Sequence, residues 1–148
     1  MAAFLYDEGR RSLGGFGTHS NMNLDDDAFS VFFNDDNTDA PSQTADQDAA
    51  DVTANNPTFA NAPALAPASN RCTISSSVLV FDGTDLAFTG SSVLTGSTSV
   101  ESVIIFKDSG TNTTSPLLSR HDDYTGLPLT PSGGDVTIVW AATGILRF

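Results

Sequence analysis

The chain has 148 residues, enough for one domain with a hydrophobic core of its own. Its 18 acidic residues outnumber six Lys and Arg residues, and the net charge of −12 excludes strong attraction to nucleic acid or to anionic membranes, which require clustered cations. The single cysteine excludes an intrachain disulfide, and no apolar run approaches the roughly 18 residues of a membrane span. The N-terminus lacks the basic and apolar regions of a signal peptide, so we expect folding in a cytoplasm.

Residues 1–33 are predicted to hold a short helix and the first strand. Phe4 to Leu13 contains helix formers and no proline, with acidic residues toward its start and arginines toward its end, as the helix dipole favours. Gly14 and Gly15 should end this helix. Residues 28–33 are aromatic and β-branched, which predicts a strand.

Residues 34–70 differ in composition from the rest of the chain. Asp, Asn, Ala, Thr and Pro dominate, so the segment cannot bury enough apolar surface by itself to offset the entropy lost on ordering. It is expected to be an extended arm along the β domain or a neighbouring subunit, or else a long surface loop. Its acidic part, Asp35 to Asp51, should face solvent or basic groups of a partner.

On the arm interpretation, a few residues of this segment would bind the partner. Phe59 and Leu65 are the apolar side chains that could anchor it. Pro63 and Pro67, with their fixed φ angles, would keep it extended and reduce the entropy lost on docking. Tyr124, in a later loop, is a further predicted partner-binding residue.

Residues 71–148 are predicted to form the β core. Residues 103–106 are apolar on both alternations, which indicates a central strand covered on both faces. Val136, Ile138 and Trp140 should face the core while the residues between them face away. The predicted strands are 72–74, 78–81, 85–89, 103–106, 116–120, 136–140 and 145–148. Short strands with Gly, Ser and Pro turns predict a mainly β fold, an antiparallel β-sandwich or jelly-roll-like domain with a short N-terminal helix and a long irregular segment.

The sequence offers little for catalysis or metal binding. His121 precedes two aspartates, which invites a general-base role with an aspartate orienting the ring. Neighbouring residues on an extended chain point apart, however, so we predict a loop histidine with local hydrogen bonds. His19 is a weaker candidate still. The acidic runs 25–27 and 35–36 could bind calcium, although neither matches the EF-hand pattern, and a solvated acidic surface is expected instead. We therefore predict no enzyme activity, no catalytic residue, no metal site and no cofactor.

The second half of the chain carries a dense set of motifs. Phe106-Lys107-Asp108 ends an apolar run, and a Gly-Leu-Pro-Leu-Thr-Pro-Ser-Gly-Gly-Asp loop spans residues 126–135. A Thr-Ile-Val-Trp strand at 137–140 and a terminal Gly-Ile-Leu at 144–146 follow. Over residues 78–148 this pattern resembles a family of short structural proteins of tailed-bacteriophage particles, and residues 6–10 and 24–31 resemble the family more loosely.

The resemblance implies a virion structural protein of the head cement or decoration type, located on the phage head and in the host cytoplasm during assembly. It implies the major capsid protein and neighbouring copies of the chain as partners, with a homo-oligomeric arrangement on the shell. It implies no catalytic residues. Direct contact with nucleic acid or membrane is not expected, in agreement with the charge.

Two other functions stay open at this point. The chain could be a neck or tail protein of the particle. It could also be a glycan-binding module that uses the loops 90–99 and 122–134. A glycan site favours exposed aromatic side chains, and Tyr124 is the one aromatic residue in those two loops, which counts against this alternative.

Overall fold

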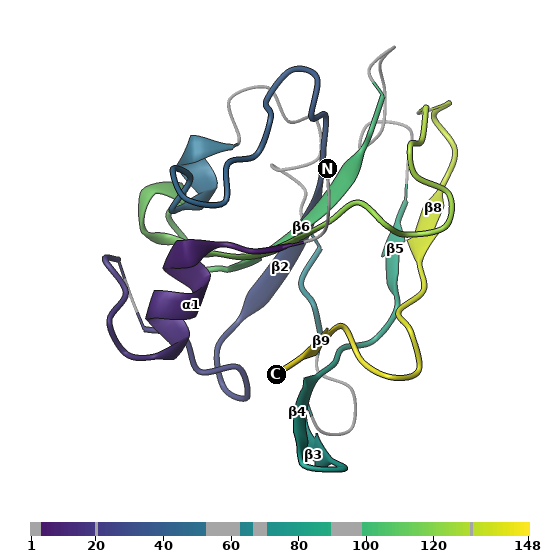
Figure 1. Ribbon diagram of the computed structural model, residues 1–148. Helices are drawn as coiled ribbons and strands as arrows, with labels where there is room; N and C mark the ends of the chain where they lie inside the picture. Colours follow the sequence, from purple (N-terminus) through teal and green to yellow (C-terminus); the bar gives the residue numbers. More distant parts are fainter. Residues whose placement is uncertain (1–3, 20, 53–62, 67–70, 90–98, 131) are drawn as a thin grey trace.

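A computed structural model gives the fold of the chain and describes residues 4–19, 21–52, 63–66, 71–89, 99–130 and 132–148. Within these residues the fold is mainly β, with antiparallel sheets of four, three and two strands and one short α-helix near the N-terminus (Figure 1). The predicted fold class is confirmed. The elements in chain order are β1 (Phe4–Leu5), α1 (Asp7–Leu13), β2 (Phe29–Asn34), η1 (Ala49–Asp51), β3 (Cys72–Ser75), β4 (Val78–Phe81), β5 (Leu86–Phe88), β6 (Ser102–Lys107), η3 (Asn112–Thr114), β7 (Leu117–His121), β8 (Val136–Ile138) and β9 (Leu146–Arg147).

The four-stranded sheet has the order β1-β7-β6-β2 and forms the centre of the molecule. β1 and β2 come from residues 1–33, whereas β6 and β7 come from the predicted β core, so these two regions build one sheet. β6 lies between β2 and β7 and five of its six residues are buried, which confirms the prediction of a central strand covered on both faces.

Two hydrophobic clusters cover the opposite faces of this sheet. Alternate residues of β2 separate accordingly: Val31 and Phe33 belong to one cluster and Phe32 to the other. The larger cluster joins the sheet to residues of β4, β5 and β8, and the smaller cluster joins it to Tyr6, to Ala49 of η1 and to Val52 directly after η1. In Figure 1 the helix and η1 accordingly lie on one side of β2 and β6, and β5 and β8 lie on the other.

The N-terminal helix starts later than predicted. Phe4 and Leu5 pair with β7 as a short strand, and the helix begins at Asp7, because backbone pairing with β7 outweighs the helix propensity of these two residues. Gly9 allows the helix to lie directly on β7: a Cβ atom there would be 2.7 Å from the carbonyl oxygen of Leu117. The helix ends at Leu13, before the two glycines, as predicted.

The remaining strands form two smaller sheets of order β3-β4-β9 and β5-β8. β3 and β4 form a hairpin whose turn residues, Ser76 and Ser77, both have positive φ, a feature that two serines do not signal in the sequence. At the C-terminal end, Gly144 has a φ of 94° and a Cβ atom would collide with Val80, so the Gly-Ile-Leu motif requires glycine here.

The alternation predicted for residues 136–140 is confirmed, although the strand itself, β8, ends at Ile138. Ile138 and Trp140 are buried, whereas Thr137 and Val139 are exposed. The indole N–H of Trp140 donates to the carbonyl oxygen of Thr84 at 2.9 Å, which satisfies the polar atom of this buried ring.

Candidate functional site

The predicted partner-binding residues lie in different parts of the fold. Pro63 and Leu65 run beside β2, where the backbone N–H of Val31 donates to Pro63 at 3.2 Å and that of Leu65 donates to Phe29 at 2.7 Å. Leu65 is 1% exposed and belongs to the larger cluster, so its side chain serves the core of the chain itself rather than an accessible docking surface. Phe59 and Pro67 lie outside the described residues.

Arg71 holds the Leu65 backbone in place, which the sequence did not indicate. This arginine is buried, and its guanidinium donates to the carbonyl oxygen of Leu65 at 2.8 Å and to that of Asp27. It also lies 5.5 Å from the ring centroid of Phe29, within range of a cation–π interaction. The short piece around Leu65 is therefore fixed by a buried cation as well as by strand-like pairing.

The acidic segment after β2 is held by Arg120, which is 1% exposed. Its guanidinium contacts the carboxylate of Asp36 and lies 3.1 Å from that of Asp122. Burial opposes the charge on this arginine, but hydrogen bonds and attraction from the two carboxylates outweigh burial and raise the Arg120 pKa. The expectation that residues 35–51 face solvent or a partner is wrong for Asp35, Asp36 and Asp48, which contact the chain itself: Asp35 and Asp48 accept backbone hydrogen bonds at turns, and Asp36 pairs with Arg120.

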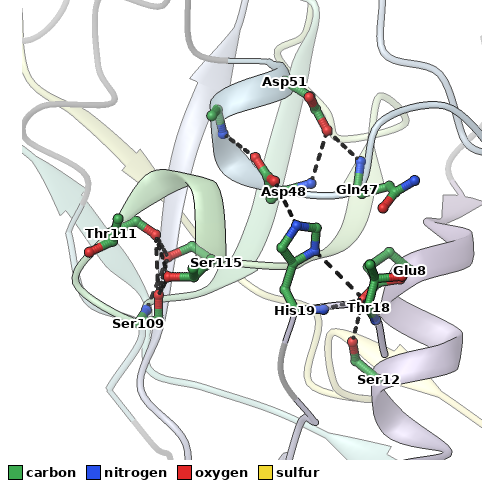
Figure 2. Close-up of polar contacts among 12 residues, drawn as sticks. Glu8, Ser12, Thr18, His19, Gln47, Asp48, Asp51, Ser109, Thr111 and Ser115 are labelled. Atoms are coloured by element: carbon green, nitrogen blue, oxygen red, sulfur yellow. Dashed lines mark hydrogen bonds and ion pairs between the residues drawn. The ribbon is translucent and has the colours of Figure 1, made fainter. Parts of the chain in front are cut away.

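A second polar junction connects α1 to η1 (Figure 2). One carboxylate oxygen of the buried Glu8 accepts hydrogen bonds from the backbone of Thr18 at 2.5 Å and from the hydroxyl of Ser12 at 3.2 Å. Nε2 of His19 lies 3.2 Å from a carboxylate oxygen of Asp48, which also caps η1 by accepting from the backbone of Ala50. The imidazole therefore sits between two acidic side chains that belong to different elements.

This junction is suited to joining elements rather than to catalysis. The hydroxyl of Ser12 hydrogen-bonds to Glu8 and not to His19, so it does not form the nucleophile–base pair that acyl transfer uses. In the described ranges no group of three or more His, Cys, Asp or Glu side chains is placed to hold a metal ion.

His121 is the last residue of β7 and is buried, so the prediction of a loop histidine is wrong. Burial in the sheet lowers its pKa to about 4, against the opposing attraction of Asp123 and Asp122, and the ring is neutral at neutral pH. Nε2 lies 3.0 Å from the hydroxyl of Ser119, and the ring stacks on Tyr124 at 5.3 Å. The polar run His-Asp-Asp suggested a loop at this position. In the structure the strand that begins at Leu117 continues as far as His121.

Tyr124 lies in the loop that follows β7 and is half-buried. Its ring stacks on His121 and meets Trp140 edge-to-face at 5.7 Å. Burial raises the pKa of its hydroxyl, with a smaller contribution from the charge of Asp123. This predicted partner-binding residue is thus partly accessible and is supported from beneath by the core.

Tyr124 contributes to an apolar groove between the loop 122–130 and β8, with a volume of about 550 Å³. Among its lining residues Phe33, Val103 and Ile138 are buried, whereas Val139 is 68% exposed. Asp123 is the one charged side chain in the described lining. The full lining is Phe33, Val103, Asp123, Tyr124, Thr125, Gly126, Leu127, Leu129, Val136, Thr137, Ile138, Val139 and Ala141.

The groove coincides with the most distinctive sequence motifs. The Gly-Leu-Pro-Leu loop, in which the peptide bond before Pro128 is cis, forms one wall, and residues 136–139 form the other. Backbone hydrogen bonds of 2.8 Å in both directions between Val100 and Leu129 fix the loop wall to the segment that precedes β6. This is the site in the described structure that best fits binding of another molecule.

A scan against protein-family models found no match, and searches of curated proteins and of solved structures found none either. No helix in the described part of the chain is long and apolar enough to cross a membrane.

Proposed function

We propose that the chain is a structural protein of a tailed-bacteriophage particle and, within the particle, a cement protein on the outside of the head. The observation that carries the proposal is that the motifs behind the phage resemblance, residues 126–129 and 136–140, build the groove and anchor it to the core through Trp140. Residues that only stabilise the fold are expected inside the core, whereas these motifs also line an accessible apolar surface, which is typical of an interaction site.

The mechanism is adhesive. Each copy binds the major capsid protein and neighbouring copies, and the buried area between subunits raises the work needed to separate them. An adhesive function requires a rigid scaffold. The central sheet provides it, together with the buried arginines Arg71 and Arg120, which hold neighbouring loop residues in place. The acidic surface disfavours contact with the packaged nucleic acid and agrees with a position outside the shell.

A glycan-binding function has less support from the geometry. One face of Tyr124 is covered by His121 and the ring also contacts Trp140, which reduces the ring surface on which a sugar could stack. The copy number of the chain in purified particles distinguishes a neck or tail position from a position on the head.

The test compares heads of the encoding phage assembled with and without this protein. We expect heads to form in both cases and those lacking the protein to lose integrity at a lower temperature or chaotrope concentration, with recovery when purified protein is added back. Equal stability of the two preparations would contradict the cement function. Failure to form heads at all would indicate an essential shell or neck role instead.

A further inference from the structure

We propose that the groove between loop 122–130 and β8 binds a partner polypeptide through one bulky apolar side chain that is flanked by Lys or Arg residues. The inference deepens the proposed function by giving the chemistry of the partner segment. It rests on the proposed function only for the identity of that partner as the shell protein.

The apolar part of the proposal follows from the lining of the groove. Its volume of about 550 Å³ lies within the roughly 300–1,000 Å³ of sites that enclose a compact ligand, so it has room for a bulky side chain together with the backbone that carries it. Phe33, Val103 and Ile138 close it on the core side, and Leu127 and Leu129 close it on the loop side. Only an apolar group recovers free energy by leaving water for such a lining.

The basic part follows from the charges around the groove. Asp123 is exposed and belongs to the lining, and Asp135 is exposed directly before the strand wall. Residues 121–146 contain no Lys or Arg, and of their three acidic residues Asp122 is paired with the buried Arg120. A segment with cations beside its apolar anchor is therefore attracted, and an acidic segment is repelled.

The same charges disfavour a second copy of the chain as the occupant. Each copy carries a net charge of −12, so two copies that meet at this acidic rim repel one another. The occupant is accordingly a different polypeptide, with a sign of charge opposite to that of the groove.

The experiment titrates the 148-residue chain with three synthetic peptides of nine residues and follows the fluorescence of Trp140. Trp140 is the single tryptophan of the chain, and it contacts Tyr124, which lines the groove. The first peptide has a central Phe flanked by Lys and Arg. The second replaces Phe by Ala, and the third replaces the basic residues by Glu. We expect the first to bind at least tenfold more tightly than either of the others, and its affinity to fall as salt is raised.

Matched variants locate the binding site. Val139, directly after β8, and Ile74, in β3, are both exposed apolar residues, at 68% and 72%, but only Val139 lines the groove. Val139→Asn should weaken binding of the basic Phe peptide about threefold or more and Ile74→Asn should leave it unchanged. Asp123→Lys should weaken the same peptide about tenfold at low salt and less at high salt. Far-ultraviolet circular dichroism checks that each variant is folded.

Several outcomes would overturn the inference. These are no saturable binding of the basic Phe peptide, equal binding of the acidic peptide, or equal effects of Val139→Asn and Ile74→Asn. Sedimentation that shows a dimer, lost in Val139→Asn and kept in Ile74→Asn, would assign the groove to a second copy instead. The proposed function is tested separately on heads, so a groove that binds the basic peptide in a protein absent from heads would refute the function and leave the groove chemistry standing.

Discussion

Two segments without regular strands, residues 35–52 and residues 122–130, differ in the contacts that hold them in place. Besides Ala49 and Val52, which are buried in the smaller cluster, the first is held by charged and polar groups: Asp36 contacts the buried Arg120, and Asp48 contacts His19. The second is held largely by apolar contacts of Tyr124, Leu127 and Leu129 with the larger hydrophobic cluster. Both segments nevertheless follow a defined path over the central sheet.

The difference shows how composition selects the way a loop is fixed. A segment rich in Asp cannot bury enough apolar area, so its backbone and carboxylates must find internal donors and cations. A segment with Leu, Tyr and Pro can dock on the core, and this leaves its polar rim available to other molecules. The groove forms in the second segment for this reason.

Trp140→Ala should have one of the two largest effects, because Trp140 supports the second segment. Truncation of a large buried aromatic side chain costs about 3–5 kcal/mol, and here it also removes the hydrogen bond to Thr84. Urea unfolding measures the loss, and hydrogen exchange should show the amides of 122–130 exposed before those of 35–52. An unchanged unfolding midpoint would mean that the indole does not support the core.

Arg120→Ala should cost a similar amount, about 3–5 kcal/mol, for an electrostatic reason. The carboxylates of Asp36 and Asp122 then lose their buried cation. The matched control is Arg10→Ala, which removes an exposed pair with Asp7 and should cost less than about 1 kcal/mol. If the two variants unfold at the same urea concentration, the first segment is not held by the buried pair.

Leu65→Ala separates a core role for this residue from a role at an interface. The side chain is fully buried, so we expect a loss of about 2–5 kcal/mol in the isolated protein. Ile74→Ala, at an exposed position, serves as the control and should change the free energy of unfolding by less than about 0.5 kcal/mol. A Leu65→Ala protein of normal stability that binds heads poorly would restore the arm interpretation.

The lowered pKa of His121 predicts a smaller, pH-dependent effect on the stability of the fold. Its pKa falls from 6.5 to about 4 on folding, so between these values the unfolded chain binds a proton that the folded chain does not. Stability from this residue is therefore fully present above pH 6.5 and is lost as the pH falls toward 4, by as much as about 3 kcal/mol.

The comparison of wild type with His121→Gln isolates this effect. The raised pKa values of Asp39 and Asp46, which arise mainly from burial, act in the opposite sense at lower pH but are common to both proteins and cancel in the difference. As the pH falls from 6.5 to 4, the wild type should lose unfolding free energy relative to His121→Gln. A constant difference over this range would contradict a buried, neutral imidazole.

The strands were largely predictable because β-branched and apolar runs mark them directly. Residues 103–106 and the alternation that ends at Trp140 identify the central strand and the core face without long-range information. The start of the helix at Asp7 was not predictable, because it depends on pairing with β7, which lies more than 100 residues away.

The candidate site was only partly predictable. Tyr124 and the Gly-Leu-Pro loop drew attention as local patterns, but the groove needs Phe33 and Val103 from distant strands. The burial of Arg120, Arg71 and Glu8 also escaped sequence reasoning, because charged residues are ordinarily placed at the surface. Leu65 was assigned to a partner because it stands alone among Ala and Pro residues in a segment of low apolar content, where no strand pattern revealed its core position.

The central claim, a structural position on the phage head, is tested most directly by the copy number of this chain in purified particles. Quantitative mass spectrometry against the major capsid protein should give a number comparable with that of the shell subunits, as a symmetric shell repeats each contact over its surface. A copy number that matches a single ring at the neck or tail, or the absence of the chain from particles, would contradict the account.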